Sequence, residues 1–301
     1  HNDNKICAIT AAMTSGTGLS PFQSEHPERF FDVGIAEPHA VTFAAGLAAG
    51  GYRPVVAIYS SFLQRAYDNI IHDVALQNLP VVFCIDRAGL NSADGATHHG
   101  IFDVAFLSHV PNIKILAPIT YGSLRASINE AAEGDMPIAV RYPNAEENAR
   151  VSEIFYPNGD FESFGVRLSF DGADAPKYVF ITYGRLINKV IEAVDILEKK
   201  GIRAGIILLE RLKPYNDIAE QISPYINSAE RVLFAEEGVK NGGAGENFAA
   251  AFAPYFVDHT AGVYPTSASG FPYSAAQMQV KGDPIADLAE DLGADDTTMY
   301  R

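Results

Sequence analysis

Short, unbroken apolar runs alternate with helical patterns along the first half of the chain, and this alternation constrains the fold more than any other feature. Because the runs show no in-out alternation, they are typical of parallel strands buried on both faces. Strands are predicted at residues 5–10, 30–35, 54–59, 80–86, 113–117 and 138–142, and helices at residues 38–49, 61–77 and 120–133. Strand–helix alternation at this spacing predicts an α/β domain with right-handed crossovers.

A polar stretch separates this pattern from a second, smaller one. Residues 144–165 (NAEENARVSEIFYPNGDFESFG) show no apolar period and predict a linker. Beyond it, about four strands are predicted, at residues 178–183, 204–209, 231–235 and 262–264, with helices at residues 186–200, 246–255 and 284–292. The prediction is therefore an α/β chain of two domains, 1–145 and 166–301, joined by a linker at 146–165, each with a mostly parallel sheet flanked by helices.

Composition excludes several classes of function. Among 301 residues, 22 are basic and 37 acidic, a net charge of −15, which argues against binding to nucleic acid or to an anionic membrane. An anionic small substrate stays possible, because a few local arginines can bind it. The two cysteines, Cys7 and Cys84, are too few for a disulfide framework, and their apolar surroundings predict buried, reduced thiols. With no apolar signal segment and no run near the roughly 20 residues of a membrane span, the chain is predicted to be soluble and cytoplasmic.

Glu37 stands between a predicted strand and a helix, in the segment FDVGIAEPHAV. Pro38 suits the first turn of a helix and disfavours the α region for the residue before it. Glu37 should therefore lie at the carboxyl end of a strand beside a helix N-terminus, where open α/β sheets bind ligands. A simpler interpretation, that Glu37 only favours the helix dipole, stays open at this point.

Aromatic and basic residues follow the next strand. Tyr59 and Phe62 lie where strand passes into helix, so they could stack on a planar ligand or simply belong to the core. Arg65 lies one helical turn after Phe62 and could face the same crevice, although the spacing taken alone favours a solvated Arg65.

A long polar loop follows the strand at residues 80–86 and combines Arg87, Asp94, His98 and His99. Such a loop at the end of a strand is a functional signal, because histidine exchanges protons near neutral pH and an aspartate can set its tautomer. Of the two histidines, one is expected to point into a site and the other to lie at the surface. A zinc site is disfavoured, because adjacent histidines lack ligand spacing and no cysteine lies close.

Arg141 lies near the end of an apolar strand, where a buried arginine needs an anionic partner. Together with Arg87 it could hold a phosphate, or it could form an internal salt bridge. Further along, the turn EEGVKNGGAGENF could cradle a phosphate before a helix, but it fits neither common phosphate-binding motif, which favours a turn made for packing.

Taken together, four segments resemble one enzyme family: FDVGIAEPHAVTFAAGLA, PVVAIYSSFLQRAYDNIIHDVALQNLPVVFCIDRAGL, ADGATHHGIFD and AVRYP. They are similar to the 1-deoxy-D-xylulose-5-phosphate synthases, thiamine-diphosphate-dependent enzymes of the transketolase superfamily, and DRAG and ADGxTHxGxFD are specific to that family. The resemblance is dense over residues 25–143. It is thinner over residues 178–301, where EEGVKNGGAGE still looks like the family's EENxxxGGAG.

The resemblance implies a pyrimidine-binding domain followed by a transketolase-type C-terminal domain. It also implies the family's reaction, which joins pyruvate, with decarboxylation, to D-glyceraldehyde 3-phosphate for isoprenoid precursor biosynthesis. Full-length members carry a further N-terminal domain with a GDG-type metal motif, which is not found in this sequence. The implied cofactors are thiamine diphosphate and Mg²⁺, the latter bound by that missing domain. The domain itself, as more chain or as a separate subunit, is the expected partner in a homodimer or heterotetramer, and without it the chain is expected to be inactive.

For the cofactor, the resemblance assigns Glu37 to N1′ of the aminopyrimidine and Phe62 to stacking on that ring. Glu37, Asp94 and His98 are the expected catalytic residues, and no metal ligand is expected in this chain.

For the substrates, the resemblance assigns Arg87 and Arg141 to the phosphate of glyceraldehyde 3-phosphate. Arg65 belongs to the matching helix and is expected at the substrate, with a less defined role. Other expected substrate contacts come from Tyr59, Asp94 and His98.

The chain departs from the family pattern at three places. Pro38 replaces a usual Gln, which leaves Glu37 intact but can alter the helix entry. Asn144 and Ala145 follow AVRYP where Arg-Gly is common, so a second basic contact is missing. The segment SGFPYSAAQMQVKGDP is unlike the family's usual one.

Two rival functions remain at this point. A split transketolase or the β-type subunit of a 2-oxo-acid dehydrogenase would have the same two domains, but the loop ADGATHHGIFD and the arginine pair favour a phosphosugar acceptor. A non-catalytic regulatory relative is disfavoured, because Glu37, Phe62, Asp94 and His98 are all retained.

Overall fold

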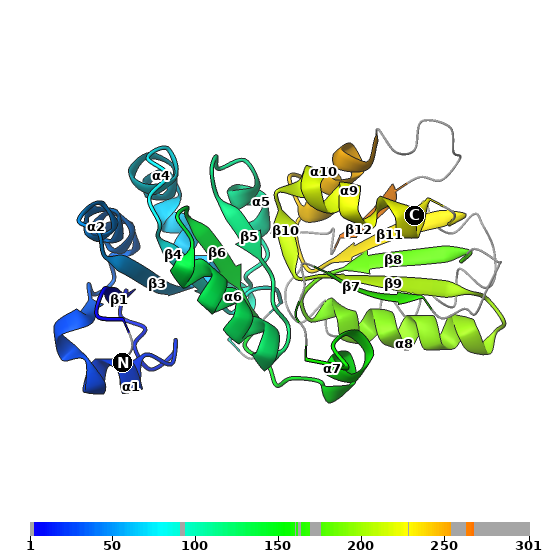
Figure 1. The fold of residues 1–301 in the computed structure, drawn as a ribbon, viewed down its shortest axis with the longest axis horizontal. Coiled ribbons are helices and arrows are strands. Elements are labelled where there is room, and N and C mark those ends of the chain that lie inside the picture. The colour runs from blue at the N-terminus through cyan, green and yellow to red at the C-terminus, as the bar shows by residue number, and fades with distance from the viewer. Residues whose placement is uncertain are drawn as a thin grey trace. The chain divides into compact units, whose positions relative to one another are not determined.

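The computed structural model describes residues 3–90, 94–159, 161, 164–168, 176–227, 229–253 and 263–267. The chain divides into two compact units, residues 1–146 and residues 147–301, which are described separately (Figure 1). No helix among the described residues has both the length and the apolar character that crossing a membrane requires.

The first unit contains a parallel sheet whose strands run in the order β5-β6-β4-β3-β1-β2. All six predicted strands are present, and β4 is buried along its whole length, as expected for a strand covered on both faces. The strands are β1 (Ile6–Thr10), β2 (Phe30–Asp32), β3 (Arg53–Tyr59), β4 (Val82–Asp86), β5 (Lys114–Leu116) and β6 (Ile138–Arg141).

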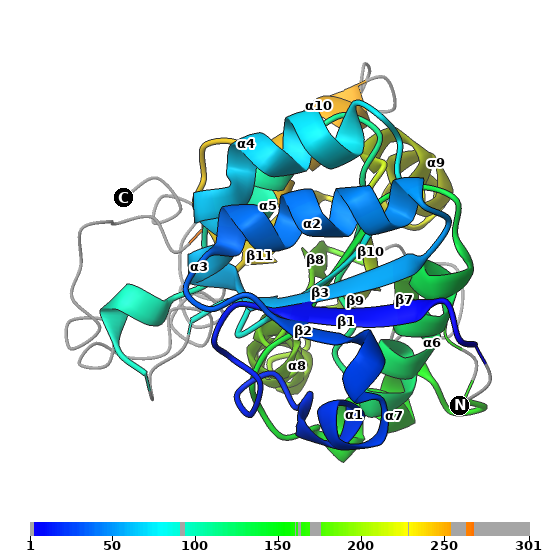
Figure 2. The same ribbon diagram turned by 90° about the vertical axis from the view of Figure 1, so that its left-hand side faces the viewer.

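Helices cover both faces of this sheet. Figure 2 shows α2 and α4 on one face and α1 and α6 on the other. Thr120 caps α6 through a reciprocal capping box with Ser123, which explains why that helix begins where the sequence predicts. The α-helices are α1 (Ser20–Glu25), α2 (Glu37–Ala49), α3 (Ser60–Leu63), α4 (Tyr67–Asn69), α5 (Asp103–Ser108) and α6 (Tyr121–Glu133). The 3₁₀ turns are η1 (Pro27–Arg29), η2 (Gln64–Ala66) and η4 (Ala96–His98), and η3 (Ile70–Ala75) is π-helical.

The second strand is shorter than its apolar pattern predicts, because β2 ends at Asp32 rather than at residue 35. The Asp32 carboxylate accepts hydrogen bonds from the backbone N–H groups of Ala12 and Gly34 and from the Thr14 hydroxyl. Gly34 has a φ of +70°, which a β-strand does not accommodate. These contacts turn the chain away from the sheet, and they lower the pKa of Asp32 despite the opposing effect of partial burial.

The helix predicted over residues 61–77 is not one regular α-helix. It runs as α3, η2, α4 and then η3, with 3₁₀ and π turns in place of uniform α geometry. Asn69 donates to Thr42 on α2 and to Asp73, so tertiary contacts act on this segment. β-branched and short polar residues form α-helix weakly, which lets such contacts decide the local winding.

The second unit contains a five-stranded sheet in the order β12-β11-β8-β9-β7, in which only β7 runs antiparallel to its neighbour. Figure 1 shows α8 on one face and α9 and α10 on the other. The strands of this sheet are β7 (Phe164–Leu168), β8 (Tyr178–Thr182), β9 (Ala204–Leu209), β11 (Arg231–Glu236) and β12 (Val263–Ser267), and β10 (Arg211–Lys213) is a short strand outside it. The helices are α7 (Ala149–Phe155), α8 (Leu186–Lys199), α9 (Tyr215–Ile226) and α10 (Ala244–Phe252).

The structure corrects the sequence prediction around residues 146–165. This segment is not all linker, because it contains α7 and the start of β7. Asn148 caps α7 by accepting from the backbone N–H of Arg150, and only two apolar side chains of that helix, Val151 and Phe155, are buried. So short an amphipathic pattern gives no visible period in the sequence.

Helix α9 was also not predicted. Ile218, Ile222 and Ile226 recur every four residues on its buried side, but Pro224 interrupts the pattern. The helix predicted at residues 284–292 lies outside the described residues, as does Gly262 in the last predicted strand.

The structure confirms the prediction that both cysteine thiols are buried and unpaired. Cys7 and Cys84 are free and buried, and burial raises the pKa of Cys84 to about 12.

Candidate active site

The carboxyl ends of three adjacent strands bring the predicted site residues together. Tyr59 on β3 is paired in register with Asp86 on β4, and Ile85 on β4 is paired with Arg141 on β6. Parallel strands end at the same edge of a sheet, so Tyr59, Arg87 and Arg141 gather there although they are far apart in sequence.

Glu37 is the first residue of α2 and is buried. The helix therefore begins one residue earlier than predicted, and Ala36 takes the non-helical capping conformation. Glu37 Oε1 accepts a hydrogen bond of 2.7 Å from Arg65 Nη1. A buried carboxylate requires such a partner, and the positive end of the helix adds to its stabilisation.

Phe62 is the centre of an aromatic cluster beside this ion pair. Its ring stacks on Tyr59 at 5.8 Å between centroids and meets His98 edge-on at 5.2 Å. The Arg65 guanidinium lies over the same ring, 5.1 Å from the centroid. The structure thus joins Glu37, Arg65, Phe62, Tyr59 and His98 in one continuous group of contacts.

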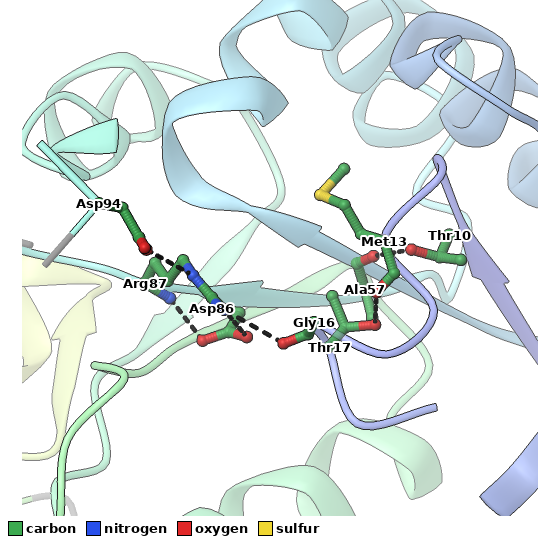
Figure 3. A network of polar contacts seen from close by, with 8 residues as sticks. All are labelled: Thr10, Met13, Gly16, Thr17, Ala57, Asp86, Arg87 and Asp94. Atoms are coloured by element: carbon green, nitrogen blue, oxygen red, sulfur yellow. Dashed lines mark hydrogen bonds and ion pairs between the residues drawn. The ribbon is translucent and has the colours of Figure 1, made fainter. Parts of the chain in front are cut away.

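Arg87 is held from several directions (Figure 3). It donates from Nη1 to Asp86 Oδ2 at 2.9 Å and to the Gly16 carbonyl at 3.1 Å, and from Nε to Asp94 Oδ2 at 3.1 Å. Its guanidinium also lies 3.8 Å from the centroid of the Tyr59 ring. Arg87 has a φ of +58°, an unfavourable value for a residue with a side chain, so these contacts maintain a strained backbone at the end of β4.

Burial and charge oppose each other at this edge. Burial raises the pKa of the Asp86 carboxyl, although the Arg87 charge and the hydrogen bonds from Arg87 act to lower it. Burial also raises the pKa of the Tyr59 phenol, and here too Arg87 acts in the opposite direction. The two groups therefore favour their neutral forms more than free side chains do.

The loop after β4 corrects two details of the sequence prediction. Asp94 pairs with Arg87, whereas His98 Nδ1 lies 3.0 Å from the Thr97 hydroxyl, so the described residues contain no His98–Asp94 pair. His98 faces Phe62 as expected of a site residue, but His99 is buried rather than exposed. The loop folds back through paired hydrogen bonds between Gly89 and Gly100, and this return brings His99 inside.

Arg141 forms the internal salt bridge that the sequence left as one of two alternatives. Its Nε donates to Asp103 Oδ2 at 2.9 Å and its Nη2 lies 3.4 Å from Asp103 Oδ1. The two side chains are 4% and 1% exposed, so each charge is compensated inside the protein. Asp103 is the first residue of α5, and its Oδ1 also accepts from the backbone N–H of Val104.

The glycine-rich turn in the second unit serves packing in this structure. The Glu236 carboxylate accepts from the backbone N–H groups of Ala244 and Gly245, which begin α10, and from the Tyr183 hydroxyl. A side chain at Gly243 would clash, because a Cβ there would lie 2.2 Å from the Val239 carbonyl oxygen and 2.7 Å from Glu236 Oε1. The protein's own carboxylate occupies the helix start, as the packing interpretation of this turn expects.

Sequence reasoning missed three contributors to this site. Asp86 and Asp103 are the carboxylates that hold the two arginines, and Gly16 supplies the carbonyl that holds Arg87. The run MTSGTG after β1, rich in Gly, Ser and Thr at a strand's carboxyl end, was the available signal for Gly16. Among the described residues, no group of three or more His, Cys, Asp or Glu side chains is arranged to hold a metal ion.

Both halves of the chain match models of known protein families. Residues 1–148 match the model described as the transketolase pyrimidine binding domain, and residues 172–282 match the transketolase C-terminal domain. The chain belongs to the transketolase family. This finding confirms the resemblance and the two-domain α/β fold predicted from the sequence.

Curated relatives within the transketolase family are substantially longer. The 1-deoxy-D-xylulose-5-phosphate synthase of Halothermothrix orenii is 46% identical over 248 residues, which make up 81% of this chain and 37% of the relative. The protein of the same name from Clostridium acetobutylicum is 44% identical over 244 residues, or 81% of this chain and 38% of the relative. The chain thus spans little more than a third of these relatives.

Solved transketolase structures share the fold. A split gene transketolase described as an inactive beta4 tetramer aligns with a TM-score of 0.74 and 24% identity, over 96% of this chain and 92% of that one. The transketolase of Pichia stipitis in complex with sedoheptulose-7-phosphate aligns with a TM-score of 0.66 and 16% identity, over 96% and 43% of the two chains. At these identities the likeness concerns the fold alone.

Proposed function

We propose that this chain is the pyrimidine-binding and C-terminal portion of a thiamine-diphosphate-dependent 1-deoxy-D-xylulose-5-phosphate synthase. The enzyme would join pyruvate, with loss of carbon dioxide, to D-glyceraldehyde 3-phosphate in isoprenoid precursor biosynthesis. Support comes from relatives of that name that are 42–47% identical over 81% of the chain.

The observation that carries the proposal is the group of contacts around Phe62. A buried carboxylate, an aromatic ring and a histidine lie together in Glu37, Phe62 and His98, next to the end of a parallel strand. These side chains fit the aminopyrimidine end of thiamine diphosphate, which needs a carboxylate at N1′ and an apolar surface for its ring.

When bound, thiamine diphosphate supplies the nucleophilic carbon and the electron sink for decarboxylation. Glu37 would exchange a proton with N1′ of the aminopyrimidine, and the hydrogen bond from Arg65 holds that carboxylate in place. Phe62 would orient the aminopyrimidine ring. His98, against the edge of Phe62, would hold or transfer a proton at the substrate.

Arg87 and Arg141 would bind the phosphate of the acceptor. Both are already oriented by carboxylates, Arg87 by Asp86 and Asp94 and Arg141 by Asp103. Because an arginine carries five N–H donors in a fixed plane, a paired guanidinium can still present further donors to a phosphate. Tyr59 and Asp94, which contact Arg87, would complete the substrate pocket.

The same proposal includes a partner. A diphosphate-binding domain that holds Mg²⁺, as more of the same polypeptide or as a separate subunit, would complete a homodimer or a heterotetramer. The chain's coverage of only 37% of its relatives supports such a partner. The cytoplasmic location and the limits 1–145 of the first domain stay predictions.

A reconstitution assay tests this function. The chain is combined with a diphosphate-binding portion, thiamine diphosphate and Mg²⁺, and product is measured from pyruvate and glyceraldehyde 3-phosphate. We expect turnover from the combination, and neither turnover nor micromolar cofactor binding from the chain alone, since its contacts address only the aminopyrimidine. Ketol transfer from a ketose phosphate donor, with no use of pyruvate, would instead identify a split transketolase. Cofactor binding without turnover of either donor would favour a non-catalytic relative.

A further inference from the structure

The two oxygens of the Glu37 carboxylate have different surroundings. The side chain is 4% exposed, and Oε1 accepts from Arg65 Nη1 at 2.7 Å. Within the part of the chain that the structure describes, Oε2 has no hydrogen-bond partner. One oxygen is therefore fixed by the protein and the other remains available to a ligand.

Arg65 is held by two contacts of different kinds. Its guanidinium binds the Glu37 carboxylate and lies over the Phe62 ring, with 5.1 Å between Cζ and the ring centroid. Residues three apart on a helical segment lie on one side of it, which places Arg65 and Phe62 together. Although the Arg65 side chain is 55% exposed, the plane of its guanidinium is set by these contacts.

The carboxylate that pairs with Arg65 is the one proposed to serve the cofactor, so the charge of Arg65 acts first on Glu37. Removing that charge would leave Glu37 with the helix terminus as its remaining positive neighbour in the described contacts. The carboxylate would then have no described side-chain contact to fix the direction of its oxygens.

We propose that Arg65 is a positioning residue for Glu37, which fixes Oε1 by its hydrogen bond and so directs Oε2 to N1′ of the aminopyrimidine. This inference rests on the proposed use of thiamine diphosphate, and it replaces the direct substrate contact expected of Arg65 from the sequence. The Phe62 contact gives Arg65 a second effect, because the same guanidinium that orients the carboxylate also steadies the ring proposed to orient the aminopyrimidine.

The test uses the reconstituted holoenzyme with Arg65→Met, which keeps the apolar stem and removes the charge, and Arg65→Lys, which restores the charge. Arg125→Met, at an exposed position on α6, controls for the loss of one positive charge. Three quantities are measured: the affinity for thiamine diphosphate by calorimetry, the exchange of the cofactor C2 proton with deuterium in the absence of substrates, and kcat and KM for both substrates.

We expect Arg65→Met to slow C2 exchange and to lower kcat by about ten- to hundredfold, the range for loss of a charge-assisted hydrogen bond. The KM values of pyruvate and glyceraldehyde 3-phosphate should stay within about twofold. Arg65→Lys should recover part of the exchange rate, because it restores the charge but not the planar contact with Phe62. Arg125→Met should behave as the unsubstituted protein. Normal C2 exchange in Arg65→Met combined with a raised KM for one substrate would overturn the proposal and restore the substrate role.

A second measurement needs no cofactor and separates this inference from the proposed function. A double-mutant cycle of Glu37→Met and Arg65→Met, read from denaturant unfolding of the chain, tests whether the two side chains are coupled, because methionine at position 37 cannot accept from Arg65. Additive effects would contradict the ion pair. If the unsubstituted holoenzyme exchanges the C2 proton but does not make the proposed product, the proposed reaction fails while the role of Arg65 is still decided by the exchange rates. If it binds no thiamine diphosphate, both fail.

Discussion

Arg141 and Asp103 form an ion pair with 2.9 Å between Nε and Oδ2, and neither side chain is more than 4% exposed. The pair joins the end of β6 to the start of α5, directly after the loop that carries His98. Each residue therefore affects both the stability of this edge and its charge. Removing one partner would leave the other charge buried without compensation, which costs more than the pair itself contributes.

For Arg141, two substitutions separate stability from substrate binding. Arg141→Ala should lower the free energy of unfolding by about 3–5 kcal/mol, measured by denaturant titration. Arg141→Lys keeps a positive charge near Asp103 but loses the planar fork, so in the reconstituted enzyme it should raise the KM for glyceraldehyde 3-phosphate by about tenfold and leave that for pyruvate nearly unchanged. Unphosphorylated glyceraldehyde is the control acceptor. If Arg141→Lys raises the KM for unphosphorylated glyceraldehyde as much as the KM for glyceraldehyde 3-phosphate, Arg141 does not bind the phosphate.

Glu37→Gln should abolish turnover of the reconstituted enzyme and leave the fold intact. Glutamine has nearly the same shape and can still accept from Arg65, but it carries no negative charge with which to exchange a proton at N1′. Circular dichroism and the unfolding midpoint check the fold, and product formation checks the activity. Turnover near that of the unsubstituted enzyme would remove Glu37 from the mechanism.

Gly16→Ala tests whether the loop after β1 holds the site in place. A Cβ at this position would lie 1.8 Å from the Tyr59 hydroxyl oxygen, so Tyr59 or the loop must move, and with it the carbonyl that binds Arg87. We expect the unfolding free energy to fall by about 1–3 kcal/mol, the usual cost of overpacking, and the KM for the acceptor to rise.

Gly46→Ala on α2 is the matched control for that substitution, because nothing lies within 4 Å of a Cβ there. It should raise stability slightly, by about 0.5–1 kcal/mol, as expected for alanine in place of a helical glycine. Equal effects of the two substitutions would show that the loop does not hold Tyr59 and Arg87.

The native chain should resist thiol reagents at pH 8. Burial raises the pKa of Cys84 to about 12 from 9.0, so the thiolate, the reactive form, is roughly a thousandfold rarer than for an ordinary thiol. Burial also raises the pKa of Cys7, although the Arg29 charge opposes it. Iodoacetamide labelling followed by mass spectrometry should modify both thiols only after unfolding. Rapid labelling of Cys84 in the native chain would contradict its burial.

The raised pKa of Cys84 also makes the free energy of unfolding depend on pH. Between about pH 9 and 12 the unfolded chain releases the Cys84 proton while the folded chain retains it. The folded state therefore binds more protons in this range, and the contribution of Cys84 to the free energy of unfolding falls as pH rises. Cys84→Ala should flatten that part of the pH dependence.

Local patterns in the sequence were enough to locate most of the scaffold. Buried parallel strands such as β4 and β9 are unbroken apolar runs, and that signal depends only on neighbouring residues. The motifs around Glu37, Phe62, Arg87 and His98 identified the family by resemblance alone. By contrast, α7 and β7 were lost in a polar stretch, since their few buried side chains give no period until the rest of the unit covers them.

The tertiary structure decided which charges meet. The sequence could propose that Arg87 and Arg141 bind a phosphate, but it did not reveal which groups of the protein hold the two arginines. These are Asp86, Asp94, Asp103 and the Gly16 carbonyl. Arg65, Arg141 and Arg87 reach partners 28, 38 and 71 residues away, distances over which no local pattern carries information. Charge pairing depends on which strand ends are neighbours and which side chains are buried, and both are set only when the sheet has assembled.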